Sequence, residues 1–135
     1  MNIFLSIIIP CFNCGKLMSR CIESLQRQTC QDFEVIFVDD YSTDDTCLFL
    51  QNFIDSNSIL ASLINAPYNG GPGKARELGV KEAKGKYVAF LDSDDYVETN
   101  MYQEMYEIAK KQNSDMAECN FIWEYPNKSR IDVGT

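Results

Sequence analysis

Short apolar runs alternate with helical segments along the chain, and this alternation limits the fold more than any other feature. Four runs have the composition of strands covered on both faces: residues 4–9, 34–38, 60–64 and 87–91. Apolar residues at the helical period predict four helices: residues 15–28, a segment that begins after Asp44 or Asp45, residues 74–84 and residues 99–112. Strands joined by helices of this length predict an α/β domain with a mainly parallel, Rossmann-like sheet flanked by helices.

The whole chain is expected to form one domain, because 135 residues suffice for a single core and no linker interrupts them. We expect Pro10 to end the first strand. A last strand is predicted at residues 116–123, and residues 126–135 read as a loop or a frayed end.

Composition excludes several classes of protein. The net charge of −8 argues against nonspecific binding to nucleic acid. The chain has no histidine and so lacks the commonest general base and zinc ligand. The six cysteines of the chain are irregularly spaced. The sequence shows no export signal, and no apolar run approaches the ~20 residues that span a bilayer. Free thiols in the cytoplasm are therefore expected.

Polar residues gather where three predicted strands end, at residues 10–13, 39–42 and 92–95. The carboxyl ends of parallel strands meet at one edge of a sheet, where open α/β sheets bind ligands. Asp92, Asp94 and Asp95 would place three carboxylates there, and closely spaced oxygen ligands suit Mg²⁺ or Mn²⁺. The alternative is a solvated, Asp-rich turn that caps the next helix. Within the segment Asp39–Asp44, we expect Asp44 to start a helix and Asp40 to face the ligand cleft.

Residues 69–76 (NGGPGKAR) form a Gly-rich loop that opens a helix. The loop matches neither a Walker motif nor the dinucleotide fingerprint, because the deciding positions lack the required residues. Backbone amides at the helix start, together with Lys74 and Arg76, would still favour a phosphate. The alternative is a mobile loop with ordinary surface basic residues.

A Cys-x-x-Cys motif at Cys11 and Cys14 lies between a strand and a helix start, as in thioredoxin-like redox sites. In that interpretation the helix N-terminus would lower the pKa of Cys11. A redox site would leave both acidic clusters unexplained, and a zinc site would need further cysteine or histidine ligands.

Four blocks together resemble glycosyltransferase family 2, whose consensus has the same blocks in the same order. They are residues 6–13 (SIIIPCFN), 24–29 (SLQRQT), 38–46 (VDDYSTDDT) and 90–95 (FLDSDD). The resemblance covers essentially the whole chain and implies the GT-A fold, a Rossmann-like nucleotide-binding α/β domain. It also implies that Pro10 and Phe12 line the base pocket, and that Asp40 accepts a hydrogen bond from the ring N–H of uracil.

The resemblance extends to the Gly-rich loop and the acidic cluster. Asn69, Gly70 and Arg76 match the family's Asn-x-Gly…Ala-Arg segment near the donor's phosphates and sugar, although Glu77 follows where the family usually has Asn. The acidic residues match the family's DxD-type motif. The resemblance implies that Asp92 and Asp94 contact the donor, and that a metal is bound at Asp94 and Asp95. Which of the last two binds the metal stays open. The metal, Mn²⁺ or Mg²⁺, would stabilise the departing diphosphate as a Lewis acid.

The function implied is an inverting glycosyltransferase that moves a sugar from a nucleotide-sugar donor, expected to be a UDP-sugar, to a hydroxyl of a glycan or lipid-linked acceptor. The catalytic base is expected beyond Thr135, since Asp115 and Glu118 come too early for that role. The chain would then hold the donor and metal site of a longer cytoplasmic enzyme, with regions outside it available for contact with the inner face of a bacterial cell membrane. Two alternatives are a non-catalytic nucleotide-binding module and a sugar-nucleotide pyrophosphorylase.

Overall fold

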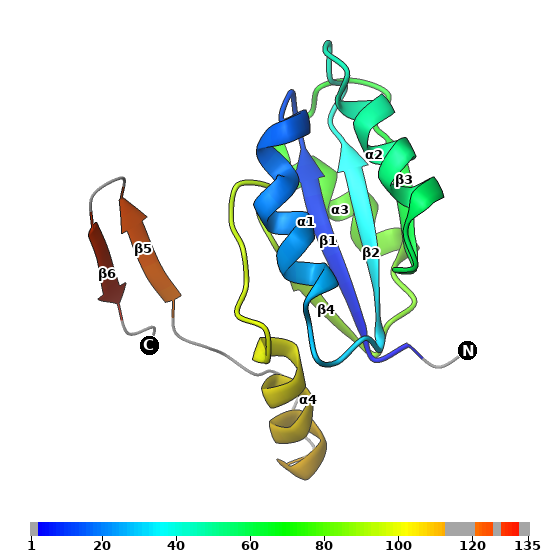
Figure 1. The fold of residues 1–135 in the computed structure, drawn as a ribbon. Coiled ribbons are helices and arrows are strands. Elements are labelled where there is room, and N and C mark those ends of the chain that lie inside the picture. The colour runs from blue at the N-terminus through cyan, green and yellow to red at the C-terminus, as the bar shows by residue number, and fades with distance from the viewer. Residues whose placement is uncertain (1–2, 113–120, 126–127, 133–135) are drawn as a thin grey trace.

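A four-stranded parallel sheet organises the chain (Figure 1). The fold is that of a computed structural model, which describes residues 3–112 and the backbone of residues 121–125 and 128–132. Its elements are β1 (Leu5–Cys11), the 3-10 turn η1 (Gly15–Met18), α1 (Ser19–Gln26), β2 (Phe33–Asp39), α2 (Thr46–Ser56), β3 (Ala61–Asn65), α3 (Pro72–Glu82), β4 (Tyr87–Phe90), α4 (Met101–Gln112), β5 (Phe121–Tyr125) and β6 (Lys128–Asp132).

The strand order β3-β2-β1-β4 confirms the predicted parallel sheet, since every neighbouring pair in it is parallel. The chain builds outward from β1 to β3 and then returns to the other side of β1 as β4. The order of strands therefore reverses between β1 and β4. In open α/β sheets such a reversal leaves a crevice at the carboxyl ends of the two strands, where ligands bind.

Helices cover both faces of the sheet, with α1 and α2 in front and α3 behind in Figure 1. Alternate residues of β1 face the two sides: Ile7 and Ile9 belong to the larger core with α1, α2 and α4, and Ile8 belongs to the smaller core under α3. A Cβ added to Gly79 would lie 2.5 Å from Cγ2 of Ile8, so α3 approaches β1 more closely than any larger residue would permit. This contact sets how closely α3 packs against the sheet.

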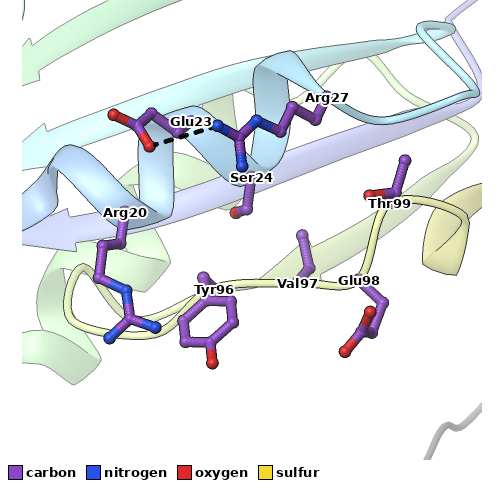
Figure 2. A pocket seen from close by; sticks show the side chains of 8 residues that line it. All are labelled: Arg20, Glu23, Ser24, Arg27, Tyr96, Val97, Glu98 and Thr99. Carbon is purple, nitrogen blue, oxygen red and sulfur yellow. Dashed lines mark ion pairs between the residues drawn. The ribbon is translucent and has the colours of Figure 1, made fainter.

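The segment after β4 runs beside α1 before it enters α4 (Figure 1). The Gln28 amide ties the two together, because it donates to the Glu98 carbonyl and accepts from the Tyr102 N–H at 3.2 Å. A pocket of about 240 Å³ lies between α1 and this segment (Figure 2). In it the Arg20 guanidinium lies 4.3 Å from the centre of the Tyr96 ring, and Arg27 pairs with Glu23.

Pro10 does not end β1, contrary to the expectation from sequence, because β1 continues to Cys11. Pro10 pairs with Val38 of β2, whereas β4 has already ended at Phe90, opposite Ile8. The Ile8 carbonyl accepts the Leu91 N–H, so main-chain groups of Ile8 and Pro10 point toward the β4 side. The missing N–H of Pro10 therefore removes no hydrogen bond from the ladder.

The C-terminal prediction was partly wrong. Residues 121–125 do form a strand, but β5 pairs with β6 in a separate antiparallel sheet, with Ile122 opposite Ile131. Residues 128–132, expected as a loop or a frayed end, form this partner strand. Their composition is too polar to indicate a strand unless their pairing with β5 is known. Residues 116–120 and the remainder of the tail lie outside the described residues.

Helix boundaries differ from the predictions by one turn or less. Residues 15–28 divide into η1 and α1, and α3 begins at Pro72, directly after Gly71 in a left-handed conformation (φ 89°). Among the described residues, no helix combines the length and apolar character that crossing a membrane requires.

Candidate functional site

The polar ends of β1, β2 and β4 lie at the same edge of the sheet, as expected, because all three strands are parallel. The reversal of strand order lies between two of them, the end of β1 at Cys11 and the residues after Phe90 of β4. Side-chain hydrogen bonds and one ion pair connect these ends with the start of α2, the loop before α3 and α3 itself. The polar edge predicted by topology is thus built from segments far apart in sequence.

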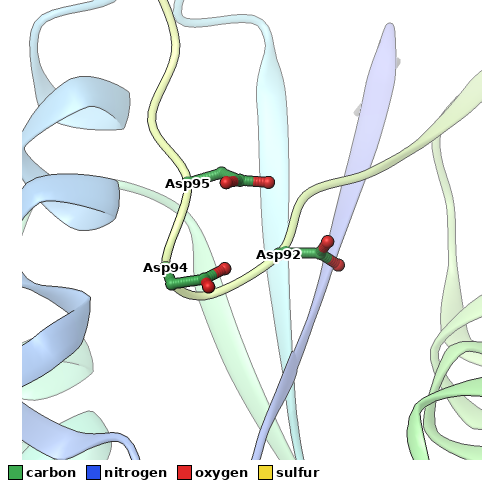
Figure 3. A group of neighbouring side chains, drawn as sticks. All are labelled: Asp92, Asp94 and Asp95. Atoms are coloured by element: carbon green, nitrogen blue, oxygen red, sulfur yellow. The ribbon is translucent and has the colours of Figure 1, made fainter. Parts of the chain in front are cut away.

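The residues directly after β4 form an acidic turn, which we define as Asp92–Asp95. Oxygens of Asp92, Asp94 and Asp95 lie within 4.8 Å of one another, and the Asp95 N–H donates to the Asp92 carbonyl at 3.1 Å. Figure 3 shows the three carboxylates turned to the same side of the chain. Partial burial, with the charges of Asp94 and Asp92, raises the pKa of Asp95. An oxygen-only cluster whose members repel one another fits a hard divalent cation, which would relieve that repulsion.

Arg76 reaches this acidic turn from α3. Its guanidinium lies 3.1 Å from Oδ1 of Asp92, and both side chains are partly exposed. Lys74, the other basic residue of the predicted phosphate loop, pairs instead with Glu77 at 3.5 Å. The structure thus brings one of the two candidate phosphate ligands to the acidic turn and ties the other to its own helix.

Asp40, at the end of β2, holds the Gly-rich loop. Its side chain is almost wholly buried, and its two oxygens accept the N–H groups of Gly70 and Gly71 at 3.0 and 2.9 Å. Sequence reasoning missed this contact, although a buried carboxylate and a loop rich in unpaired amides are complementary in chemistry. Each oxygen retains a further lone pair for a ligand. Asn69, also predicted near the donor, is exposed in the same loop.

The loops after β1 and β2 interlock. Asn13 accepts the Thr43 N–H at 2.8 Å, while the Asn13 N–H donates to the Ser42 hydroxyl at 3.0 Å. Asn13 and Tyr41 both adopt left-handed conformations, with φ of 48° and 65°. A bulky residue such as Tyr41 rarely takes this conformation, and such strain is concentrated at functional sites.

Thr46, at the start of α2, is a second anchor that sequence reasoning missed. It is wholly buried, and its hydroxyl accepts the N–H groups of Cys14 and Gly15 at 3.0 and 3.1 Å. Asp44 accepts the Thr46 N–H at 3.0 Å, whereas the N-cap residue of α2 is Asp45, whose side chain makes no capping hydrogen bond. Hydrogen bonds from the Thr46 hydroxyl and backbone lower the pKa of Asp44.

Pro10 and Phe12, predicted to line a base pocket, lie at the end of β1 and directly after it. Phe12 is 47% exposed, and Tyr41 and Tyr68 are exposed aromatic residues after β2 and β3. The carboxyl edge of the sheet therefore carries aromatic faces available for stacking on a planar ligand.

The two cysteines of the Cys-x-x-Cys motif differ in environment, in a way opposite to the expectation. A side-chain hydrogen bond with Cys14, together with burial, raises the pKa of Cys11. Hydrogen bonds from Cys11 and Ser93 lower the pKa of Cys14 to about 6. The expected lowering at Cys11 was therefore wrong, because Cys11 is buried at the end of a strand and Cys14 adjoins the helical turn. The five described cysteines are free thiols, as predicted.

Comparisons with known proteins agree with this architecture. The family model described as "Glycosyl transferase family 2" matches residues 6–133. Glycosyltransferase GlyG of Streptococcus pneumoniae serotype 4 is 31% identical over 121 residues, which cover 90% of this chain and 40% of GlyG. Poly(ribitol-phosphate) beta-glucosyltransferase of Bacillus spizizenii is 37% identical over 114 residues, which cover 83% of this chain and 18% of that protein.

A solved structure shares the fold. The crystal structure of S. aureus TarS 1–349 in complex with UDP-GlcNAc superposes with a TM-score of 0.77 at 33% identity, covering 84% of this chain and 33% of that chain. The chain spans less than half the length of each of these relatives. The family match, the sequence identities and the shared architecture lead to one conclusion: the chain belongs to glycosyltransferase family 2 and has the GT-A fold.

Proposed function

We propose that this chain forms the donor-binding part of an inverting glycosyltransferase and binds a UDP-sugar together with Mn²⁺ or Mg²⁺. The observation that carries the proposal is the acidic turn, whose three carboxylates lie within 4.8 Å of one another at the reversal point of the sheet, beside Arg76. The bound UDP-GlcNAc of TarS, at 33% identity, supports a uridine nucleotide as the donor.

The base of the donor would lie at the ends of β1 and β2. Phe12 offers an exposed ring there, Pro10 a rigid neighbour, and Asp40 a carboxylate with free lone pairs for the ring N–H of uracil. Since Asp40 already orders the Gly-rich loop, base binding and loop position would depend on the same side chain.

The diphosphate would lie between the Gly-rich loop and the acidic turn. Asn69 and Gly70 supply polar groups of the loop, and Arg76 supplies a planar cation suited to phosphate. Arg76 is paired with Asp92 at 3.1 Å, so phosphate binding would exchange one anionic partner for another. Asp92 and Asp94 would then contact the sugar or ribose.

Asp94 and Asp95 would hold the metal, with Asp92 near enough to contribute an oxygen. When bound, the cation supplies Lewis-acid stabilisation of the departing diphosphate. The chain's own contribution is to orient the donor through Asp40 and Arg76. The base that takes the proton from the acceptor hydroxyl is expected in a longer protein, where a glycan or lipid-linked acceptor would bind.

Calorimetric titration of the chain with UDP, with and without Mn²⁺, tests this proposal. Binding should depend on the metal and be lost in the Asp94→Ala/Asp95→Ala variant. The matched control is Asp32→Ala/Asp55→Ala, which removes the same charge near the opposite edge of the sheet, before β2 and late in α2. Equal UDP binding by the acidic-turn variant and the control would contradict the metal site.

The role of Arg76 is tested separately by comparing UDP with uridine. Arg76→Gln should weaken UDP binding and leave uridine binding unchanged, because only UDP carries the diphosphate. Lys74→Gln is the control, since Lys74 pairs with Glu77 within α3. An equal loss of UDP affinity in both variants would assign the effect to net charge.

The alternatives differ in what they require of the sheet edge. A pyrophosphorylase would need a Gly-rich basic loop after β1, where the chain has Cys11, Phe12, Asn13 and Cys14. A non-catalytic module would bind nucleotide without a metal requirement, which the same titration would reveal.

A further inference from the structure

We propose that the pocket between α1 and residues 96–99 binds one sugar ring of a saccharide acceptor. This cavity of about 240 Å³, here called the α1 pocket, is lined by residues of α1, by its C-cap Arg27 and by residues 96–99 (Figure 2). It begins directly after the acidic turn, because Tyr96 follows Asp95 in the chain. Binding of a saccharide there does not depend on the proposed function, whereas its role as the acceptor rests on that function.

Hydrogen bonds hold the wall formed by residues 96–99 against α1. The Thr29 N–H donates to the Thr99 carbonyl at 3.0 Å, and the amide of buried Gln28 donates to the Glu98 carbonyl. Gln28 also accepts the Tyr102 N–H at 3.2 Å, which ties the second residue of α4 to the same place. The wall is therefore preformed, and a ligand would lose little affinity to the ordering of that wall.

The lining of the α1 pocket is polar and has no net charge. Seven of its eight side chains carry a polar group, and the exception is Val97. Its two guanidiniums and two carboxylates cancel in charge, and one of each, Arg27 and Glu23, lie 3.9 Å apart. A sugar hydroxyl both donates to a carboxylate and accepts from a guanidinium, so a polyhydroxylated ligand matches both kinds of group. A simple anion would match only the guanidiniums and would be repelled by the carboxylates.

Tyr96 gives the pocket an aromatic surface. Its side chain is 39% exposed, and the Arg20 guanidinium lies 4.3 Å from the centre of its ring. A ring with a polar tip suits a ligand that carries both C–H groups and hydroxyls, as a sugar ring does. Figure 2 shows Arg20 and Tyr96 at one end of the pocket and Arg27 and Thr99 at the other. The Tyr96 end adjoins the acidic turn, so a saccharide in the pocket could extend from it toward the donor site.

The volume of the pocket suits a single sugar ring. Pockets for drug-sized ligands occupy roughly 300–1,000 Å³, and the α1 pocket, at about 240 Å³, is slightly smaller. The next unit of a longer saccharide would therefore lie outside the pocket, beside the acidic turn. The pocket is thus proposed as an acceptor subsite next to the reacting centre, and its side chains would position the acceptor without acting on the reacting atoms.

Amide NMR spectra of the chain with methyl glycosides test the site directly. The probes are the methyl β-glycosides of glucose, galactose and N-acetylglucosamine, at concentrations up to about 100 mM, since ligands with so few atoms bind in the millimolar range. At least one glycoside should shift the amides of residues 20–27 and 96–99 in a saturable way. Inorganic phosphate is the comparison probe. The proposal would be overturned if none of the glycosides produced saturable shifts, or if phosphate bound at these residues more tightly than they do.

Two variants of the lining test which side chains bind the sugar. Arg20→Gln and Tyr96→Ala should each weaken glycoside binding about three- to tenfold, the loss expected for one hydrogen bond or one ring contact. The matched control is Lys86→Gln, which removes the same charge from a cation that lies 5.7 Å from the centre of another ring, that of Tyr87. The amide spectrum of each variant reports whether it is folded. Glycoside affinities equal to that of the parent chain in both pocket variants would refute the assignment.

Simultaneous binding separates an acceptor subsite from a site for the sugar of the donor. The glycoside should still bind when UDP-GlcNAc and Mg²⁺ are present, because the α1 pocket lies beside the donor site; Mg²⁺ is used here since Mn²⁺ broadens NMR signals. Displacement of the glycoside by UDP-GlcNAc would assign the pocket to the donor's sugar and overturn the acceptor role.

The acidic turn itself should not be required for the glycoside. The Asp94→Ala/Asp95→Ala variant should bind it as the parent chain does, and a loss equal to that in Tyr96→Ala would place the sugar at the acidic turn instead. Glycoside binding at residues 20–27 and 96–99 in a chain that fails to bind UDP would count against the proposed function, and the saccharide site would stand independently of it.

Discussion

Replacing Thr46 by valine removes one hydroxyl group from a wholly buried position and preserves the shape of the side chain. The hydroxyl accepts the N–H groups of Cys14 and Gly15, at 3.0 and 3.1 Å. Valine offers no acceptor, so both N–H groups lose their partner. The perturbation therefore tests whether the end of β1 depends on α2 for its conformation.

The magnitude follows from the burial of the two donors. A buried N–H without an acceptor costs about 1–3 kcal/mol, and the full range applies to Gly15, which is buried. Cys14 is half-buried and can reach water, so its cost is near 1 kcal/mol, and the added methyl group offsets about 0.8 kcal/mol. We expect the free energy of unfolding to fall by about 2 kcal/mol, a decrease in Tm of roughly 6–10 °C for a chain of this size.

Urea denaturation followed by circular dichroism measures this loss, and Thr46→Ser is the matched control. Serine keeps the hydroxyl and lacks the buried methyl group, so it should cost about 1 kcal/mol. Hydrogen exchange should also accelerate at the Gly15 amide in the valine variant and stay slow in the serine variant. A valine variant as stable as the serine variant, with slow exchange at Gly15, would refute the anchoring role of the hydroxyl.

Three further predictions concern the Gly-rich loop, the thiol and α3. Asp40→Asn should lower the free energy of unfolding by about 1.5–3 kcal/mol in urea denaturation, because one of the two loop N–H groups would face an amide donor; an unchanged midpoint would contradict this. The reduced chain should be alkylated at Cys14 with a rate that rises through pH 6, where hydrogen bonds place its pKa, instead of near 9. Since the pKa of Cys14 is lower in the folded chain, the thiolate's contribution to the free energy of unfolding is complete above pH 9 and is lost as pH falls through about 6. A midpoint near pH 9 for the alkylation rate would contradict the lowered pKa. Gly79→Ala should destabilise the chain by about 1–3 kcal/mol, because its Cβ would lie 2.5 Å from a buried Ile8 atom. Gly73→Ala, with open space around the added Cβ, should instead stabilise the chain by up to about 1 kcal/mol. Equal thermal midpoints for the two variants would show that α3 can shift freely.

Local patterns in the sequence determined the class of fold and the edge at which the site lies. Nearly continuous apolar runs such as residues 34–38 can be covered only between two layers, and helices between them make the strands parallel. Parallel strands in turn bring residues 10–13, 39–42 and 92–95 to one edge. Asp92, Asp94 and Asp95 could be assigned to one cluster for a further reason, since they are close neighbours in sequence.

Only the tertiary structure decided which side chains contact one another across that edge. Asp40 and Gly70, like Arg76 and Asp92, come from different elements, and their contacts depend on where α3 settles against Ile8. The strand position of Pro10 depended on where β4 ends, and β6 exists because β5 pairs with it. Sequence periodicity records which face of an element is buried, whereas distances between side chains follow from packing of the elements in three dimensions.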